Sequence, residues 1–191
     1  MSTPTTSARG PGAVRLVAAG TCARIVLAPV IMALVLAGDA AEVAAAVLFV
    51  AVAATDFWDG WLARRWGITT TLGSFLDTTA DKLLVTGVLI ALVGADRVST
   101  WIAAIIVGRE LVILALRGVV AVDGEVMPPS IWGKLKTAIQ FVAIPLAILR
   151  PGSPIAGLYL DQWVMLVAAA ITVMSAVEYL QRFSSALTGR D

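Results

Sequence analysis

Two pairs of aspartates interrupt apolar stretches of the sequence, and their spacing suits metal-ion chemistry. Asp56 and Asp59 stand three positions apart, and Asp77 and Asp81 stand four apart. In a helix, each pair would share one face. The short segment around Gly67 would make the two helices antiparallel neighbours, so we expect their acidic faces to meet at a similar depth.

Four carboxylates crowded together in a medium of low dielectric constant would repel one another and take up protons. A divalent cation removes this penalty, and both Mg²⁺ and Mn²⁺ prefer oxygen ligands. The chain has no histidine and a single cysteine, Cys22, so a hard metal held by carboxylates is favoured over zinc. We therefore predict that two Mg²⁺ or Mn²⁺ ions bind to Asp56, Asp59, Asp77 and Asp81.

The same acids have an alternative, purely structural interpretation. Each would then lie at a membrane surface or pair with Arg64, Arg65 or Lys82. That explanation suits a single aspartate better than four at this spacing, because acids inside membrane helices are costly and mark functional sites.

The composition indicates that the bilayer is the solvent of this chain. Of its 191 residues, 59% are hydrophobic and only 14% are charged, and the mean hydropathy is +0.91. A soluble domain is about half apolar and a quarter charged. The net charge of +1 argues against a nucleic-acid-binding protein.

Six segments contain enough apolar residues to cross a bilayer as helices, which takes about 20 residues each. Residues typical of turns separate them. We expect an all-α integral membrane domain over residues 13–183, between a disordered tail at 1–12 and a C-terminal tail at 184–191. The six predicted transmembrane helices are Val14–Ala37, Ala40–Arg64, Thr71–Val93, Ser99–Val120, Gly133–Leu149 and Trp163–Phe183.

Lysine and arginine are distributed unequally between the two ends of these helices. An even number of helices puts both termini on one side, and that side carries most of the positive charge, whereas the other side has only Arg97 and Arg150. Positive residues favour the cytoplasmic side, so both termini are predicted to be cytoplasmic. The residues on that side are Arg9, Arg15, Arg64, Arg65, Lys134, Arg182 and Arg190.

The four aspartates belong to a longer pattern, D-x2-D-G-x2-A-R-x8-G-x3-D-x3-D, which the sequence reproduces without a gap or substitution. This pattern resembles the signature of the CDP-alcohol phosphotransferase family. The resemblance implies six transmembrane helices around a polar cavity open to the cytoplasm. The residues that carry the pattern are Asp56, Asp59, Gly60, Ala63, Arg64, Gly73, Asp77 and Asp81.

Roles for these residues follow from the resemblance. It implies that the four aspartates hold two divalent metals and that Asp81 is also the catalytic base. It further implies a CDP-binding set that consists of Asp59, Gly60, Ala63, Arg64 and Gly73.

A second polar set lies further along the chain and is rich in positive charge. We predict that Arg109, Arg117, Lys134 and Lys136 bind a phosphate group on the acceptor substrate. Anchoring at the cytoplasmic surface is the alternative for Arg117 and Lys134, but it explains Arg109 poorly, because Arg109 stands beside Glu110 between apolar stretches. The pattern R-E…R…G-K-x-K-T-x-x-Q resembles the family branch whose acceptor is sn-glycerol 3-phosphate.

Together these features predict a multi-pass enzyme of the bacterial cytoplasmic membrane, with its active site facing the cytoplasm. It would transfer the phosphatidyl group of CDP-diacylglycerol to sn-glycerol 3-phosphate, giving phosphatidylglycerophosphate and CMP. Asp81 would accept the proton of the attacking hydroxyl. Membrane lipids surround such a chain, and a homodimer is compatible with it.

Two kinds of alternative stay open. Within the family, phosphatidylglycerol (in cardiolipin synthesis) or inositol phosphate could be the acceptor, since each also presents a phosphate. Outside the family, a cation or proton transporter could use the four acids as a relay. The relay is disfavoured because the periplasmic halves of the predicted helices are almost wholly apolar.

Overall fold

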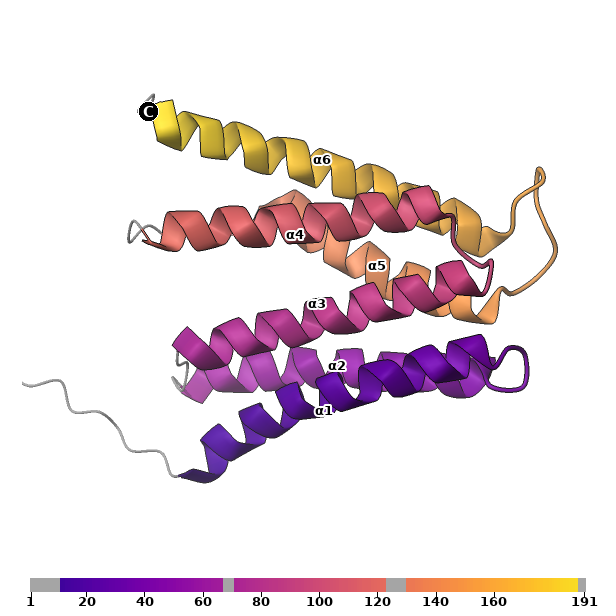
Figure 1. Ribbon diagram of the computed structural model, residues 1–191, viewed down its shortest axis with the longest axis horizontal. Coiled ribbons are helices and arrows are strands. Elements are labelled where there is room, and N and C mark those ends of the chain that lie inside the picture. The colour runs from indigo at the N-terminus through magenta and orange to yellow at the C-terminus, as the bar shows by residue number, and fades with distance from the viewer. Residues whose placement is uncertain (1–10, 67–70, 123–129, 189–191) are drawn as a thin grey trace, which may run out of the picture.

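The computed structural model describes residues 11–66, 71–122 and 130–188, and the side chains of residues 20–55, 77–120 and 130–184. In this part of the chain the structure is built from helices, joined by short loops (Figure 1). The helices are α1 Pro11–Leu36, α2 Glu42–Trp66, α3 Thr71–Gly94, α4 Thr100–Val122, α5 Ile131–Leu149 and α6 Leu160–Thr188.

The six predicted helical segments are therefore confirmed in number and order within the described residues, while some predicted ends were wrong. Helix α5 begins before the predicted Gly133, because the Ser130 side chain caps it by accepting a hydrogen bond from the Gly133 amide at 2.9 Å. Helix α2 begins after the predicted Ala40, because Gly38, at φ 79°, forms a turn there.

The helices pack as two groups of three. Helix α1 packs on α2 and α3, while α6 packs on α4 and α5, and α2 joins the groups through α5. Helix α3 makes fewer contacts with α4 and α5. In Figure 1, α1 begins and α6 ends at the same end of the bundle.

A buried apolar core joins α1, α2, α3 and α5. Ile31, Phe49, Leu89 and Ile144 each have no exposed surface. The outer faces of the same bundle are apolar too. Val43, for example, is 67% exposed. By length and apolar content alone, two stretches among the described residues are able to cross a membrane, and they are Ile131–Leu149 and Leu160–Ser184.

Charged side chains join the loops at the end of the bundle away from the chain termini. Arg97 pairs with Glu42, at the start of α2. Arg150 donates hydrogen bonds to the backbone oxygens of Asp96 and Arg97, at 3.3 and 2.8 Å. The Arg150 guanidinium also lies 3.5 Å from the carboxylate of Asp161, in the first turn of α6. These contacts tie together the loops that connect α1 to α2, α3 to α4 and α5 to α6.

Candidate active site

Helix α3 presents its two aspartates to different surroundings. The Asp77 carboxylate faces α1, where Oδ1 accepts hydrogen bonds from the Arg24 guanidinium at 2.6 Å and the Thr21 hydroxyl at 3.2 Å. Arg24 is 1% exposed, whereas the Asp77 side chain is 32% exposed, so the ion pair reaches from inside the bundle to its surface. A buried guanidinium therefore balances the charge of Asp77 on the α1 side.

Asp81, one turn further along α3, lines a small pocket between α3, α4 and α5. The pocket also contains charged side chains from each of those helices: Lys82 from α3, Glu110 from α4 and Lys136 from α5. Phosphate binding requires such cations, and proton removal requires such a carboxylate. The remaining lining residues are Val85, Thr137, Gln140 and Phe141.

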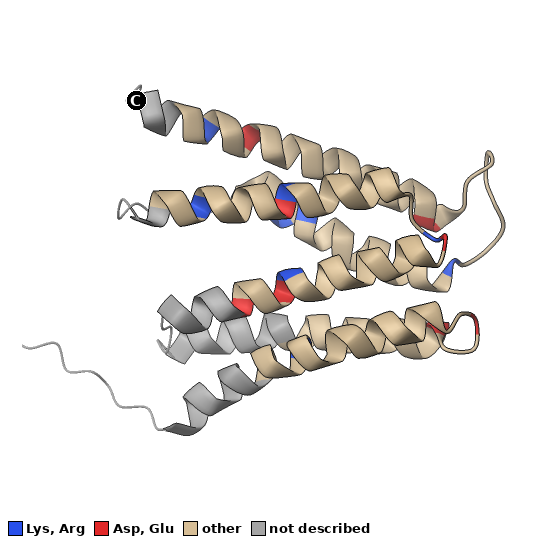
Figure 2. Cartoon of the chain, viewed as in Figure 1, with Lys and Arg blue, Asp and Glu red and all other residues tan. Residues whose placement is uncertain are grey.

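Glu110 is the centre of the charged cluster. One carboxylate oxygen, Oε2, contacts the Lys82 ammonium, and the other, Oε1, contacts the Lys136 ammonium. The Arg109 guanidinium also lies 3.4 Å from Oε1. The side chains of Glu110 and Lys136 are only 5% and 6% exposed. Buried charges persist when they are paired in this way. Figure 2 shows the charged positions of α3 and α4 facing each other part-way along the bundle.

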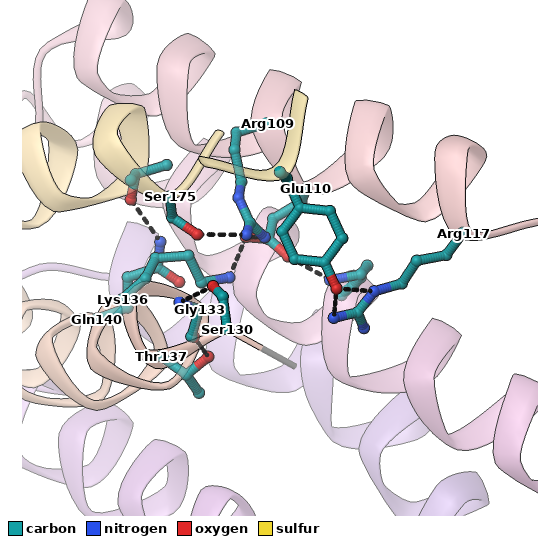
Figure 3. Close-up of polar contacts among 12 residues, drawn as sticks. Arg109, Glu110, Arg117, Ser130, Gly133, Lys136, Thr137, Gln140 and Ser175 are labelled. Atoms are coloured by element: carbon teal, nitrogen blue, oxygen red, sulfur yellow. Dashed lines mark hydrogen bonds and ion pairs between the residues drawn. The ribbon is translucent and has the colours of Figure 1, made fainter. Parts of the chain in front are cut away.

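Arg109 reaches away from this pocket, towards α6 (Figure 3). Its guanidinium donates a hydrogen bond to the Ser175 hydroxyl at 2.6 Å and lies 5.8 Å from the centre of the Tyr179 ring. Arg117 binds the hydroxyl of the same tyrosine, to which its Nε donates a hydrogen bond at 2.8 Å. Both arginines therefore tie α4 to α6.

The four predicted acceptor residues do not form one cluster. Lys136 and Arg109 meet at Glu110, and of these two only Lys136 lines the pocket with Asp81. Arg117 is bound to Tyr179. Lys134 is exposed, because α5 has already begun at Ile131 and residues two apart on a helix point to different faces.

Six other predicted site residues have helical backbones, but their side chains lie outside those that the structure describes. In the part that it does describe, no three side chains of histidine, cysteine, aspartate or glutamate come together as a metal-binding group. The six residues are Asp56, Asp59, Gly60, Ala63 and Arg64 in α2 and Gly73 in α3.

Four residues that were not among the predicted site residues lie beside them in the structure: Lys82, Glu110, Ser175 and Tyr179. The sequence did carry a signal for two of them. Ser175 and Tyr179 stand four apart, so they share one face of α6, and in the structure both are almost fully buried. Polar side chains buried at this spacing on one face are expected to bind a common partner, here the arginines of α4.

The bundle thus combines apolar outer faces with carboxylates and lysines gathered around an internal pocket, as expected of an enzyme that handles phosphate groups on lipids. The family model described as CDP-alcohol phosphatidyltransferase matches residues 17–174. The chain therefore belongs to the CDP-alcohol phosphatidyltransferase family, and the resemblance noted from the aspartate pattern is confirmed.

Within this family, the chain is similar to proteins named for one particular reaction. The chain is 38% identical over 186 residues to the CDP-diacylglycerol–glycerol-3-phosphate 3-phosphatidyltransferase of Bacillus subtilis, which covers 87% of this chain and 94% of the relative. It is 40% identical over 168 residues to a probable phosphatidylglycerophosphate synthase of Mycobacterium tuberculosis, covering 85% and 78%. A Sodalis glossinidius protein with the same name as the Bacillus one is 38% identical over 166 residues, covering 84% and 90%.

Proposed function

We propose that this chain transfers the phosphatidyl group of CDP-diacylglycerol to sn-glycerol 3-phosphate, forming phosphatidylglycerophosphate and CMP. The observation that carries the proposal is the pocket that places Asp81 beside Lys82 and Lys136. It offers a proton acceptor and two cations to a substrate that has both a hydroxyl and a phosphate. The printed names of the relatives support the same acceptor.

In this mechanism the lysines hold the acceptor phosphate, and Asp81 lies within the same pocket to meet the hydroxyl. The primary hydroxyl oxygen attacks the phosphorus of the phosphatidyl group, and Asp81 accepts its proton. The bond between that phosphorus and the oxygen of CMP breaks, and CMP leaves with the electron pair. Because the lysines hold the acceptor by its phosphate, its hydroxyl meets the bound CDP-diacylglycerol as if the two were parts of one molecule.

Lys136 is the best placed of the predicted acceptor residues, and Lys82 joins it. Arg109 does not line the pocket, but its guanidinium contacts the carboxylate of Glu110, which does. Lys134 is exposed, so its contribution is attraction of the anionic acceptor towards the site.

Asp56, Asp59, Asp77 and Asp81 would hold two divalent metal ions, Mg²⁺ or Mn²⁺. The structure describes the side chains of Asp77 and Asp81. Both suit Mg²⁺ or Mn²⁺, because they offer carboxylate oxygens, the donors that hard cations prefer. Asp77 is 32% exposed and its Oδ1 already pairs with Arg24, so a metal ion would share this carboxylate with the guanidinium. When bound, the ions would neutralise charge on the pyrophosphate and on departing CMP.

The CDP group would bind along α2 and the start of α3, at Asp59, Gly60, Ala63, Arg64 and Gly73. We further propose that all six helices cross the cytoplasmic membrane and that the active site opens to the cytoplasm. The apolar outer faces support this placement, since large exposed apolar surface mixes with lipid rather than water.

An acceptor assay tests the proposal. The purified chain in detergent would receive CDP-diacylglycerol and Mg²⁺, with sn-glycerol 3-phosphate, phosphatidylglycerol or inositol phosphate supplied one at a time. We expect CMP release and phosphatidylglycerophosphate only with sn-glycerol 3-phosphate. Faster turnover with either of the other acceptors would overturn the proposed substrate.

A further inference from the structure

Glu110 connects three helices through two lysines. Lys82 comes from α3 and Lys136 from α5, and each ammonium contacts a different oxygen of the Glu110 carboxylate on α4. Lysine side chains are long and flexible, and an ammonium deep in a bundle is stable only with a counter-ion. Because α3 packs sparsely on α4 and α5, this carboxylate is a principal link between them at the pocket.

The carboxylate leaves both lysines able to bind a ligand. An ammonium has three N–H donors, and each lysine gives one of them to Glu110. Both lysines and Asp81 line the same pocket, so the remaining donors are available on the side where the acceptor would enter. Glu110 lines the same pocket and also contacts Arg109, which does not line it.

The charge balance of the cluster favours an anionic ligand. Lys82, Lys136 and Arg109 contribute three positive charges, and Glu110 and Asp81 contribute two negative ones, which leaves one net positive charge. A phosphate monoester carries about −1.5 to −2 charges at neutral pH. Without Glu110, two ammonium groups would face each other unscreened in a medium of low dielectric constant.

We infer that Glu110 is a positioning residue for the acceptor: it holds Lys82 and Lys136 together so that both bind one phosphate, and thereby selects a phosphorylated acceptor. This inference rests on the proposed function of the pocket. Glu110 acts through the two lysines, because its own negative charge repels the phosphate that they bind.

The test is Glu110→Gln, which keeps the shape of the side chain and removes its charge. We expect the KM for sn-glycerol 3-phosphate to rise about 10- to 100-fold, as for the loss of charge-assisted contacts, while the KM for CDP-diacylglycerol stays within about twofold. Glu110→Asp keeps the charge on a shorter side chain, so its KM for sn-glycerol 3-phosphate should lie between those of the wild type and Glu110→Gln. The matched control is Glu178→Gln on α6, whose carboxylate pairs with the exposed Arg182 at 2.6 Å. Its kinetics should equal the wild type.

A double-variant cycle separates positioning from mere structural support. If Glu110 acts through Lys82 and Lys136, adding Glu110→Gln to Lys136→Gln should raise the acceptor KM by a smaller factor than Glu110→Gln does in the wild type, because only Lys82 is left for Glu110 to position. Glu110→Gln alone could fail to fold, because it leaves Lys136 without its counter-ion. In that case the acceptor KM is compared between the wild type, Glu110→Asp and the double variant, which has no lysine at position 136.

Three results would overturn the inference: an unchanged acceptor KM in Glu110→Gln, a lower one, which would make Glu110 a competitor of phosphate, or a parallel loss for both substrates. Failure of the proposed function is distinguishable from these. If the wild type used a different phosphorylated acceptor, the proposed substrate would fall, yet a selective rise in the KM for that acceptor in Glu110→Gln would still support the positioning role.

Discussion

Two lysines that are close in the sequence should differ sharply in their effect on acceptor affinity. Lys136 is buried and lines the pocket with Asp81, whereas Lys134 is exposed on another face of α5. Replacing each by glutamine removes the same charge from positions only two residues apart. The pair therefore tests whether the pocket or the general basic character of the segment binds the phosphate.

The expected magnitudes follow from the surroundings of each lysine. A charge-assisted hydrogen bond to phosphate in a buried site contributes about 1.5–3 kcal/mol, so Lys136→Gln should raise the KM for sn-glycerol 3-phosphate roughly 10- to 150-fold. An exposed charge contributes about 0.2–1 kcal/mol, which for Lys134→Gln gives roughly 1.5- to 5-fold. Salt screens exposed charges within about 10 Å at 0.1 M, so the Lys134 effect should fade as ionic strength rises and the Lys136 effect should persist.

The assay is the initial rate of CMP release in mixed micelles, with CDP-diacylglycerol saturating and the acceptor varied. The melting temperature of each variant must be measured too, because Lys136→Gln leaves part of the Glu110 charge unbalanced. An effect of Lys134→Gln equal to or larger than that of Lys136→Gln, in folded protein, would refute the assignment of the pocket to the acceptor.

Three further predictions concern the base, the metal and the stability of the bundle. Asp81→Asn should lower kcat about 10²- to 10⁴-fold while CDP-diacylglycerol binding, measured by equilibrium dialysis, largely survives; wild-type turnover would remove Asp81 from the mechanism. Excess EDTA should abolish CMP release and Mg²⁺ or Mn²⁺ should restore it, so full turnover in EDTA would contradict the metal assignment. Asp161→Ala removes the ion pair with Arg150, whose side chain is 19% exposed and keeps its hydrogen bonds to two backbone oxygens. It should therefore destabilise the fold by about 1 kcal/mol, seen as a lower melting temperature with an unchanged acceptor KM.

The helices were predictable because their signal is local. A bilayer demands about 20 apolar residues in a row, so six such runs separated by turns fix six helices without knowledge of any contact. The start of α5 shows where this reasoning was less exact. The prediction placed it at Gly133, but Ser130 accepts a hydrogen bond from the Gly133 amide and starts the helix at Ile131. That shift moves Lys136 beyond the first turn of the helix, so Lys134 and Lys136 point to different faces.

The role of Glu110 was not predictable, because it depends on the way in which distant helices meet. In the sequence Glu110 stands beside Arg109, which suggests a local ion pair. Adjacent side chains on a helix diverge, and in the structure Arg109 is 3.4 Å from the carboxylate while its guanidinium binds Ser175. The main partners of Glu110 lie 28 and 26 residues away, on α3 and α5. No periodicity in the sequence specifies that meeting.

The position of the pocket between the two groups of helices has a consequence for substrate binding. The acids predicted to bind metal belong to α2 and α3, in one group, whereas Glu110 and Lys136 belong to α4 and α5, in the other. In the proposed reaction the donor would therefore be held by the first group of helices, and the acceptor by lysines of both groups, which the pair of Lys82 with Glu110 joins at the pocket. The apolar core runs from α1, α2 and α3 into α5, so it holds the two groups together on either side of the pocket. Binding of a phosphate by Lys82 and Lys136 would then place the acceptor hydroxyl near Asp81, which lines the same pocket.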